Sequence, residues 1–253
     1  MTIGFAGADS SVPVTHQVNG QTLIDLATGL FGQAPRVWGR YFKSVTGGSP
    51  AEYRHAIENQ PLRDQGIRVA CLAQQTNNVG GDGAQGATDA LANAEDLIAS
   101  FGAAYLQSQG GQVLMFLDVE GTGNSILSAD YYTGWSQTLV SHSQAFSNGA
   151  VTIRPCIYAP QGNDPTWQAL ASAAQVGAPC DGAWIARWRH DGCAPLPNFD
   201  MSLVTPNVAI PCPILLWQYA NDCHGSDGFD CDTINPNIDV QAFLRKCVLP
   251  PGT

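Results

Sequence analysis

The chain has 253 residues, of which 44% are hydrophobic and 9% aromatic, enough apolar material for a sizeable core. This composition argues against a mostly disordered protein. Eleven lysine and arginine residues stand against 21 aspartate and glutamate residues, which gives a net charge of −10. That charge argues against nucleic acid or an anionic membrane as partner, because both attract clustered cations. No apolar run approaches the roughly 18 residues of a membrane-spanning helix.

Strand-like and helix-like segments alternate along the chain. Apolar strand patterns occupy residues 3–8, 36–42, 67–72, 113–120, 152–158, 183–186, 214–219 and 238–240. Helices are predicted over residues 21–31, 83–101, 128–146 and 165–174, and a last helix runs through Lys246. A capping box that contains proline, Ser49-Pro50-Ala51-Glu52, predicts the start of another helix, and Pro61 is expected to break or end it.

This alternation predicts a parallel sheet, and eight strands in roughly 250 residues predict a closed barrel in a single domain, 1–253. The pattern becomes irregular after the sixth strand, because residues 187–213 contain proline, glycine and cysteine but no helical period. We therefore expect an α/β fold, an irregular TIM-type (β/α) barrel with about five regular βα units followed by loop-connected strands. An open doubly wound sheet is the alternative, but no dinucleotide-binding glycine pattern follows the first strand.

The eight cysteines are many for this length and lie mostly in the C-terminal half. The absence of a C-x-x-C pair disfavours zinc ribbons and thioredoxin-like sites. We expect about two to four disulfides and a secreted or periplasmic protein, because disulfides persist in oxidising compartments. No signal peptide is visible, since the first strand begins almost at Met1. The alternative is a cytosolic chain with buried thiols such as Cys71 and Cys156, which lie inside strand-like runs.

Two carboxylates end the fourth predicted strand. Asp118 and Glu120 follow five consecutive apolar residues, and the ends of parallel barrel strands form the face where active sites lie. Residues two apart on a strand point to the same side, so both are expected to face the barrel mouth. Neighbouring carboxyls between apolar walls do not ionise together easily, which leaves a proton donor beside an ionised partner. Glycoside hydrolysis uses such a pair. In the alternative, one of the two carboxylates caps a loop and the other pairs with an arginine.

Further polar and aromatic residues lie at or near the ends of other predicted strands and are expected at the same mouth. Aromatic rings stack on sugar faces while polar groups bond hydroxyls, so the set predicts a carbohydrate site. For each aromatic taken singly, packing in the core or rim is the alternative. The candidate substrate-binding residues are Arg40, Tyr41, Gln74, Tyr158, Arg187, Trp188, Gln218 and Tyr219, and the further candidate catalytic carboxylates are Asp9 and Asp239.

Several segments follow the order of marker segments in glycoside hydrolase family 25, the muramidase-type lysozymes. They are Leu117-Asp118-Val119-Glu120, Trp184-Ile185-Ala186, Trp217-Gln218-Tyr219 and Ile238-Asp239-Val240-Gln241-Ala242-Phe243. The chain resembles still more closely a related family of secreted bacterial glycoside-hydrolase-like domains, through Gly39-Arg40-Tyr41 and Gly86-Ala87-Thr88-Asp89-Ala90. The resemblance implies an irregular (β/α) barrel that hydrolyses peptidoglycan or another cell-wall or extracellular polysaccharide.

The same resemblance implies roles for individual carboxylates. Glu120 would be the general acid, Asp118 would stabilise charge or orient an acetamido group, and Asp239 would be a carboxylate of the last strand. Family 25 enzymes also carry an aspartate two residues after the first-strand glycine; here that position is Ala6, and Asp9 lies three residues later. This departure leaves a non-catalytic glycan- or protein-binding barrel as the alternative function.

No metal or other cofactor is expected. The spacing of His224 with Cys223 and Cys231 fits no tetrahedral zinc pattern. The aspartates at 222, 227, 230 and 232 lack the register of a known calcium loop. A serine nucleophile is also disfavoured, since no G-x-S-x-G occurs. The expected partner is a polysaccharide substrate, with no nucleic acid and no membrane span, and the sequence leaves the oligomeric state open.

Overall fold

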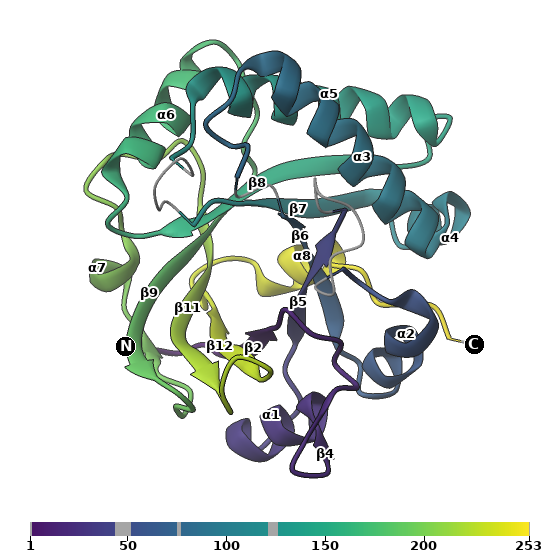
Figure 1. The fold of residues 1–253 in the computed structure, drawn as a ribbon, viewed down its shortest axis with the longest axis vertical. Helices are drawn as coiled ribbons and strands as arrows, with labels where there is room; N and C mark the ends of the chain where they lie inside the picture. Colours follow the sequence, from purple (N-terminus) through teal and green to yellow (C-terminus); the bar gives the residue numbers. More distant parts are fainter. Residues whose placement is uncertain (1, 44–51, 75–76, 121–125, 253) are drawn as a thin grey trace.

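The computed structural model describes residues 2–43, 52–74, 77–120 and 126–252. Within them, eight strands close into a barrel in the order β11-β12-β2-β5-β6-β7-β8-β9 (Figure 1). These strands are β2 (Phe5–Asp9), β5 (Val37–Phe42), β6 (Arg68–Gln74), β7 (Gln112–Asp118), β8 (Thr152–Pro160), β9 (Ala183–Asp191), β11 (Ile214–Cys223) and β12 (Phe229–Ile234). The predicted closed α/β barrel is therefore confirmed.

Five βα units form the first part of the barrel, as the sequence predicts, and their strands from β2 to β9 pair in parallel. The helices that cover these strands are α1 (Leu23–Phe31), α2 (His55–Asp64), α3 (Gly83–Phe101) with α4 (Ala103–Ser108), α5 (Ala129–Phe146) and α6 (Asp164–Gln175). Pro61 does not end its helix, because α2 continues to Asp64. Residues 49–51 of the expected capping box lie outside the described residues.

The glycine-aspartate marker at the start of α3 has a packing role. A side chain on Gly86 would overlap the backbone of α5 at Tyr131, so glycine lets the two helices approach closely. Asp89, one turn later, is buried and accepts hydrogen bonds from the Tyr131 hydroxyl at 2.7 Å and the Gln85 amide at 2.8 Å. This segment fastens α3 to α5.

The barrel changes character after β9. Short elements alone cross from β9 to β11 within the described chain, namely β10 (Asn198–Phe199) and α7 (Met201–Val204). A tight turn then reverses the chain, with Asp222, His224 and Gly225 at positive φ, and β12 returns antiparallel between β11 and β2. The eighth strand is thus residues 229–234, and the prediction of a strand at 238–240 is wrong. Minor pairings join β1 (Thr2–Ile3) to β10 and β3 (Gln17–Val18) to β4 (Gln21–Thr22).

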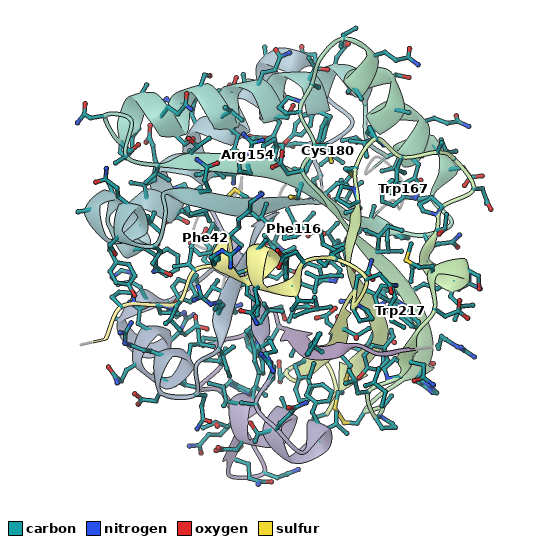
Figure 2. All side chains as sticks on the ribbon, turned by 180° about the vertical axis from the view of Figure 1, so that it is seen from behind. Phe42, Phe116, Arg154, Trp167, Cys180 and Trp217 are labelled. Atoms are coloured by element: carbon teal, nitrogen blue, oxygen red, sulfur yellow. A yellow bond between two sulfur atoms is a disulfide. The ribbon has the colours of Figure 1, made fainter. Side chains whose placement is uncertain are left out.

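Side chains fill the barrel interior, so it is a packed core. Phe116 and Trp184 meet edge to face at 5.5 Å between ring centroids, and Phe116 lies at the centre of the barrel in Figure 2. Helix α8 (Val240–Arg245) lies across the end where the parallel strands begin and contributes Phe243 and Leu244 to the interior cluster. That end is closed, which leaves the opposite end for a site. Within the described ranges, no helix combines the length and apolar character needed to cross a membrane.

Candidate active site at the barrel mouth

A row of polar side chains crosses the ends of β6, β7 and β8. Asp118 is the last residue of β7 and is 1% exposed, and its register partners are Gln74 on β6 and Tyr158 on β8. Burial, followed by the negative charges of Asp9 and Asp118, raises the pKa of the Tyr158 hydroxyl, so this group stays a neutral hydrogen-bond donor. The structure thus brings together three residues that the sequence places at strand ends.

A second group of carboxyls lies at the seam where the first and last barrel strands meet. Asp9 ends β2 and pairs in register with Asp230 of β12, and Asp232 is two residues further along. Asp9 is 5% exposed, and Asp232 is fully buried with its Oδ1 accepting a hydrogen bond from Trp184 Nε1 at 2.9 Å. Burial raises the pKa of all three carboxyls, and the negative charge of Asp9 raises those of Asp230 and Asp232 further, that of Asp230 to about 8. The seam therefore retains protons near neutral pH.

The Gln218 side chain connects this seam to the aromatic residues. Its Nε2 donates to Asp9 Oδ2 and to Asp230 Oδ2, both at 2.9 Å. Its Oε1 accepts from the Tyr158 hydroxyl at 2.8 Å and from Trp188 Nε1 at 2.6 Å. Because both amide protons and both lone pairs of the oxygen are engaged, the amide positions its neighbours and has no capacity left for a ligand.

Glu120 lies where two hollows of the mouth meet. One is a cleft of about 510 Å³ lined by Glu120, Trp188, Arg187, Ala186, Pro165 and residues 160–163. The other is a polar cavity of about 180 Å³ lined by Glu120, Asp9, Tyr41, Asp222, Asp230 and parts of the loops after β2 and β11. Glu120 is exposed, which differs from the expectation that apolar walls would desolvate it. Its carboxylate is reachable from both hollows.

The cleft has the features of a surface for a sugar ring. Trp188 is 53% exposed although its indole N–H is hydrogen-bonded to Gln218, so its ring is held in place with its face available. Arg187 lines the same cleft, and its Nη1 donates to the carbonyl of Leu203 at 3.1 Å and to Gln161 Oε1 at 3.3 Å. A fixed, exposed aromatic face beside polar groups suits stacking on a pyranose.

Two predicted mouth residues face the outer side of the barrel. Arg40 is fully buried, pairs with Glu58 at 2.8 Å, and donates from Nη1 to the Ser10 carbonyl at 2.6 Å. It therefore fixes the loop that follows Asp9 and does not line the mouth. Tyr219 is buried in the layer between barrel and surface segments, where its hydroxyl donates to the Ala194 carbonyl at 3.2 Å. Side chains alternate along a strand, so both lie opposite neighbours that point inward.

Asp239 lies at the wrong end of the barrel for the proposed chemistry. Its side chain caps α8 by accepting a hydrogen bond from the backbone N–H of Ala242 at 2.9 Å. Helix α8 closes the end opposite the mouth, because β12 runs antiparallel to the other strands and delivers the chain there. The carboxylates that the last strand brings to the mouth are Asp230 and Asp232.

Asp9 places a carboxyl at the mouth although Ala6 occupies the position of the first-strand aspartate. Counted from Gly7 instead of Gly4, an aspartate follows two residues later, and the structure turns Asp9 inward. The neighbouring β5 makes room for it, because a Cβ on Gly39 would lie 2.5 Å from Asp9 Cβ and 2.6 Å from the Trp184 ring. Glycine in the Gly39-Arg40-Tyr41 segment is thus required by the close approach of two site residues.

Sequence reasoning missed Asp230, Asp232 and Trp184 as site residues. A usable signal exists in Phe229-Asp230-Cys231-Asp232, which alternates polar and apolar side chains with the period of a strand. It is obscured because the polar side faces the barrel interior, the reverse of the usual pattern. Trp184 belongs to a marker segment, and in the structure its ring packs edge to face against Tyr158 and donates a hydrogen bond to Asp232.

The cysteines form fewer crosslinks than expected. Among the described residues one disulfide forms, between Cys193 and Cys223. Four of the remaining cysteines are buried thiols, including Cys71 and Cys156 within strands. Within the same part of the chain, the cluster with metal-ligand spacing is Cys193, Cys223 and His224, and its two sulfurs are already bonded to each other.

Comparison with models of protein families finds no match, and comparison with curated proteins also finds none. Solved structures share the fold. An uncharacterized protein of B. stearothermophilus superposes with a TM-score of 0.63 and 20% identity over 96% of this chain and 100% of its own. The lysozyme of Streptomyces coelicolor superposes with a TM-score of 0.53 and 17% identity, over 97% of this chain and 99% of its own. A family 25 glycosyl hydrolase of Bacillus anthracis superposes with a TM-score of 0.51 and 14% identity, over 96% of this chain and 93% of its own. The chain therefore has the fold of the family 25 lysozyme-type proteins.

Proposed function

We propose that the protein is a glycoside hydrolase that cleaves a cell-wall or extracellular polysaccharide, with peptidoglycan as the leading candidate. The observation that carries the proposal is the position of Glu120 between a cleft that exposes a fixed indole ring and a cavity lined by carboxyls. A sugar stacked on Trp188 would bring a glycosidic oxygen within reach of Glu120. The fold shared with lysozymes supports the same substrate class.

Glu120 would act as the general acid. In the free protein it is exposed, and a glycan lying over it would displace water and favour its protonated form. Asp118, fully within the mouth and 1% exposed, would stabilise positive charge at the anomeric carbon or hold an acetamido group. Tyr41, Gln74, Tyr158 and Trp188 would contact the substrate, while Gln218 and Arg40 would hold the carboxyl groups in place.

A secreted protein fits this function. The substrate class lies outside the cytoplasm, and the Cys193–Cys223 disulfide is typical of oxidising compartments. The competing proposal is a barrel that binds a glycan without cleaving it. Ala6 favours this binding barrel, because family 25 enzymes carry an aspartate at that position. Asp9 nevertheless places a carboxyl at the mouth.

Glu120→Gln separates the two proposals, because it keeps the shape and removes the transferable proton. Release of reducing ends is measured from peptidoglycan, chitin-type and neutral glucan substrates in parallel, together with binding to each insoluble substrate. Turnover should fall about 10²–10⁴-fold while binding changes little. Glu95→Gln is the matched control, since Glu95 is exposed on α3 and its Oε1 lies 2.9 Å from the Nε2 of the His142 ring on α5.

The result that favours the binding barrel is equally specific. The wild-type chain would bind one of the polysaccharides but release no reducing ends, and Glu120→Gln would behave in the same way. A loss of turnover equal for Glu120→Gln and Glu95→Gln would instead point to a general effect of charge.

A further inference from the structure

The crossover from β9 to β11 is the part of the barrel that is least supported by helices. Each earlier pair of parallel strands is joined through a helix of nine residues or more, whereas this crossover, residues 192–213, contains only β10 and the four-residue α7 within the described chain. The strands themselves pair in parallel, from Ile214 opposite Ala183 to Asn221 opposite Asp191. Something other than helix packing must hold the two strands and their connection.

One end of this strand pair is already crosslinked. Cys193 lies two residues beyond Asp191 at the end of β9, and Cys223 lies two residues beyond Asn221 on β11. The strand register therefore places the two cysteines opposite each other at the mouth, where their disulfide forms.

The other end carries a second pair of cysteines in the equivalent position. Cys180 lies three residues before β9, and Cys212 lies two residues before β11. Their sulfurs are 3.1 Å apart, and backbone bonds hold both flanking segments, among them Ala183 N–H to the Pro213 carbonyl at 2.9 Å. A disulfide requires about 2 Å between sulfurs, so a shift of roughly 1 Å closes the bond.

We propose that Cys180 and Cys212 form a second disulfide, so that covalent links fasten β9 to β11 at both ends in place of a crossover helix. Figure 2 shows Cys180 beside Arg154 under the helical layer, and Arg154 binds Asp181 through two hydrogen bonds of 2.8 and 3.0 Å. This ion pair holds the Cys180 segment against β8 and keeps the thiol near its partner.

The oxidant of this step is a disulfide, either of a small molecule or of a dithiol oxidase in an oxidising compartment. The Cys180 thiolate attacks one sulfur of the oxidant and expels the first thiolate. The Cys212 sulfur then attacks the mixed disulfide at Cys180 and expels the second. Two electrons pass to the oxidant, and the two cysteine protons end on the released thiols.

Access and acidity favour this pair over the other free cysteines. Cys180 and Cys212 are partly exposed, whereas Cys71, Cys156, Cys231 and Cys247 are buried. A hydrogen bond from the Cys212 thiol lowers the pKa of Cys180, while burial raises the pKa of Cys71 and Cys156. The more readily ionised and more accessible thiol reacts first with a disulfide oxidant.

The experiment uses the full chain equilibrated with oxidised glutathione, then quenched in denaturant with N-ethylmaleimide. Cleavage before aspartate releases Cys180 in segment 164–180 and Cys212 in segment 200–221, each with a single cysteine. Mass spectrometry without reduction should show these two segments joined, next to the joined segments 191–199 and 222–226 that carry Cys193 and Cys223. The count of alkylated thiols should fall from six to four.

Two variants complete the test. Cys212→Ser should leave segment 164–180 unlinked to any other segment, with Cys180 carrying either maleimide or one glutathione, because no second thiol is present to resolve the mixed disulfide. Cys71→Ser should leave the joined segments unchanged and lower the thiol count by one. The proposal is overturned if segments 164–180 and 200–221 both carry maleimide after oxidation while the Cys193–Cys223 link is intact. It is also overturned if Cys180 pairs with another cysteine. Neither outcome depends on whether the protein cleaves a glycan.

Discussion

Gln218→Glu replaces the amide that joins Asp9 to Asp230 by a group of the same shape. The wild-type Nε2 donates to both carboxyls at 2.9 Å from a position that is 1% exposed. With one of the two carboxyls ionised, the bond to the carboxylate is worth about 1.5–3 kcal/mol and the bond to the neutral carboxyl about 0.5–1.5 kcal/mol. Losing both predicts a destabilisation of about 2–4 kcal/mol at pH 8.

The loss should depend on pH in a defined direction. The introduced carboxyl faces two acidic neighbours, so its pKa in the folded state should lie above the ordinary value of about 4.3. A group whose pKa is raised by folding stabilises below its unfolded pKa, and that stability is lost as the pH rises through the folded pKa. At pH 4–5 the neutral carboxyl of residue 218 also donates one hydrogen bond, so the loss of unfolding free energy relative to wild type should fall to about half of its value at pH 8.

Urea unfolding followed by tryptophan fluorescence at pH 4.5 and pH 8 measures both effects. Gln137→Glu is the control, because residue 137 is exposed on α5 and gains the same charge. A deficit below about 0.5 kcal/mol at pH 8, or one that does not change with pH, would refute the role assigned to this amide.

Three further substitutions address the site and its support. Asp239→Ala should cost about 0.5–2 kcal/mol in urea unfolding through loss of the α8 cap and leave turnover unchanged, whereas a catalytic role predicts a large loss of turnover. Gly39→Ala should destabilise by about 1–3 kcal/mol because its Cβ would overlap Asp9 and Trp184, while Gly29→Ala, in open space on α1, should be neutral or stabilising in the same thermal melts. Burial and the charge of Asp9 raise the pKa of Asp230 to about 8, so stability should decline from about pH 4 to pH 8. Asp230→Asn should flatten that decline, and an unchanged slope would contradict the assignment.

The regular βα units were accessible from the sequence because they bury both faces of each strand. The run from Val113 to Leu117 reads as a covered strand without ambiguity, and β7 occupies residues 112–118. The strand-end rule then placed Asp118 and Glu120 at the mouth side. What it could not supply is the direction of each side chain at a strand end, since Arg40 and Tyr41, or Gln218 and Tyr219, are neighbours that point to opposite sides.

The last strand was missed for a physical reason. Its inward face carries Asp230 and Asp232, so the apolar run that marks the other strands is absent. The motif at Asp239 resembled a strand followed by a helix, but that short apolar pattern belongs to the segment that leads into the α8 cap. Because β12 runs antiparallel to the other strands, its N-terminal end lies at the mouth, and no local sequence pattern indicates this direction.

The seam between β2 and β12 also bears on how the molecule folds. These strands come from opposite ends of the chain, so almost the whole polypeptide must be in place before they can pair. Contacts of such long sequence separation form slowly, because loop closure precedes any gain from pairing. Asp9, Asp230 and Asp232 therefore stay hydrated and well separated until the barrel closes. Assembly of the acidic cluster should coincide with the last step of folding, and a ribosome-bound or truncated chain that ends before residue 229 would keep β2 as an open sheet edge.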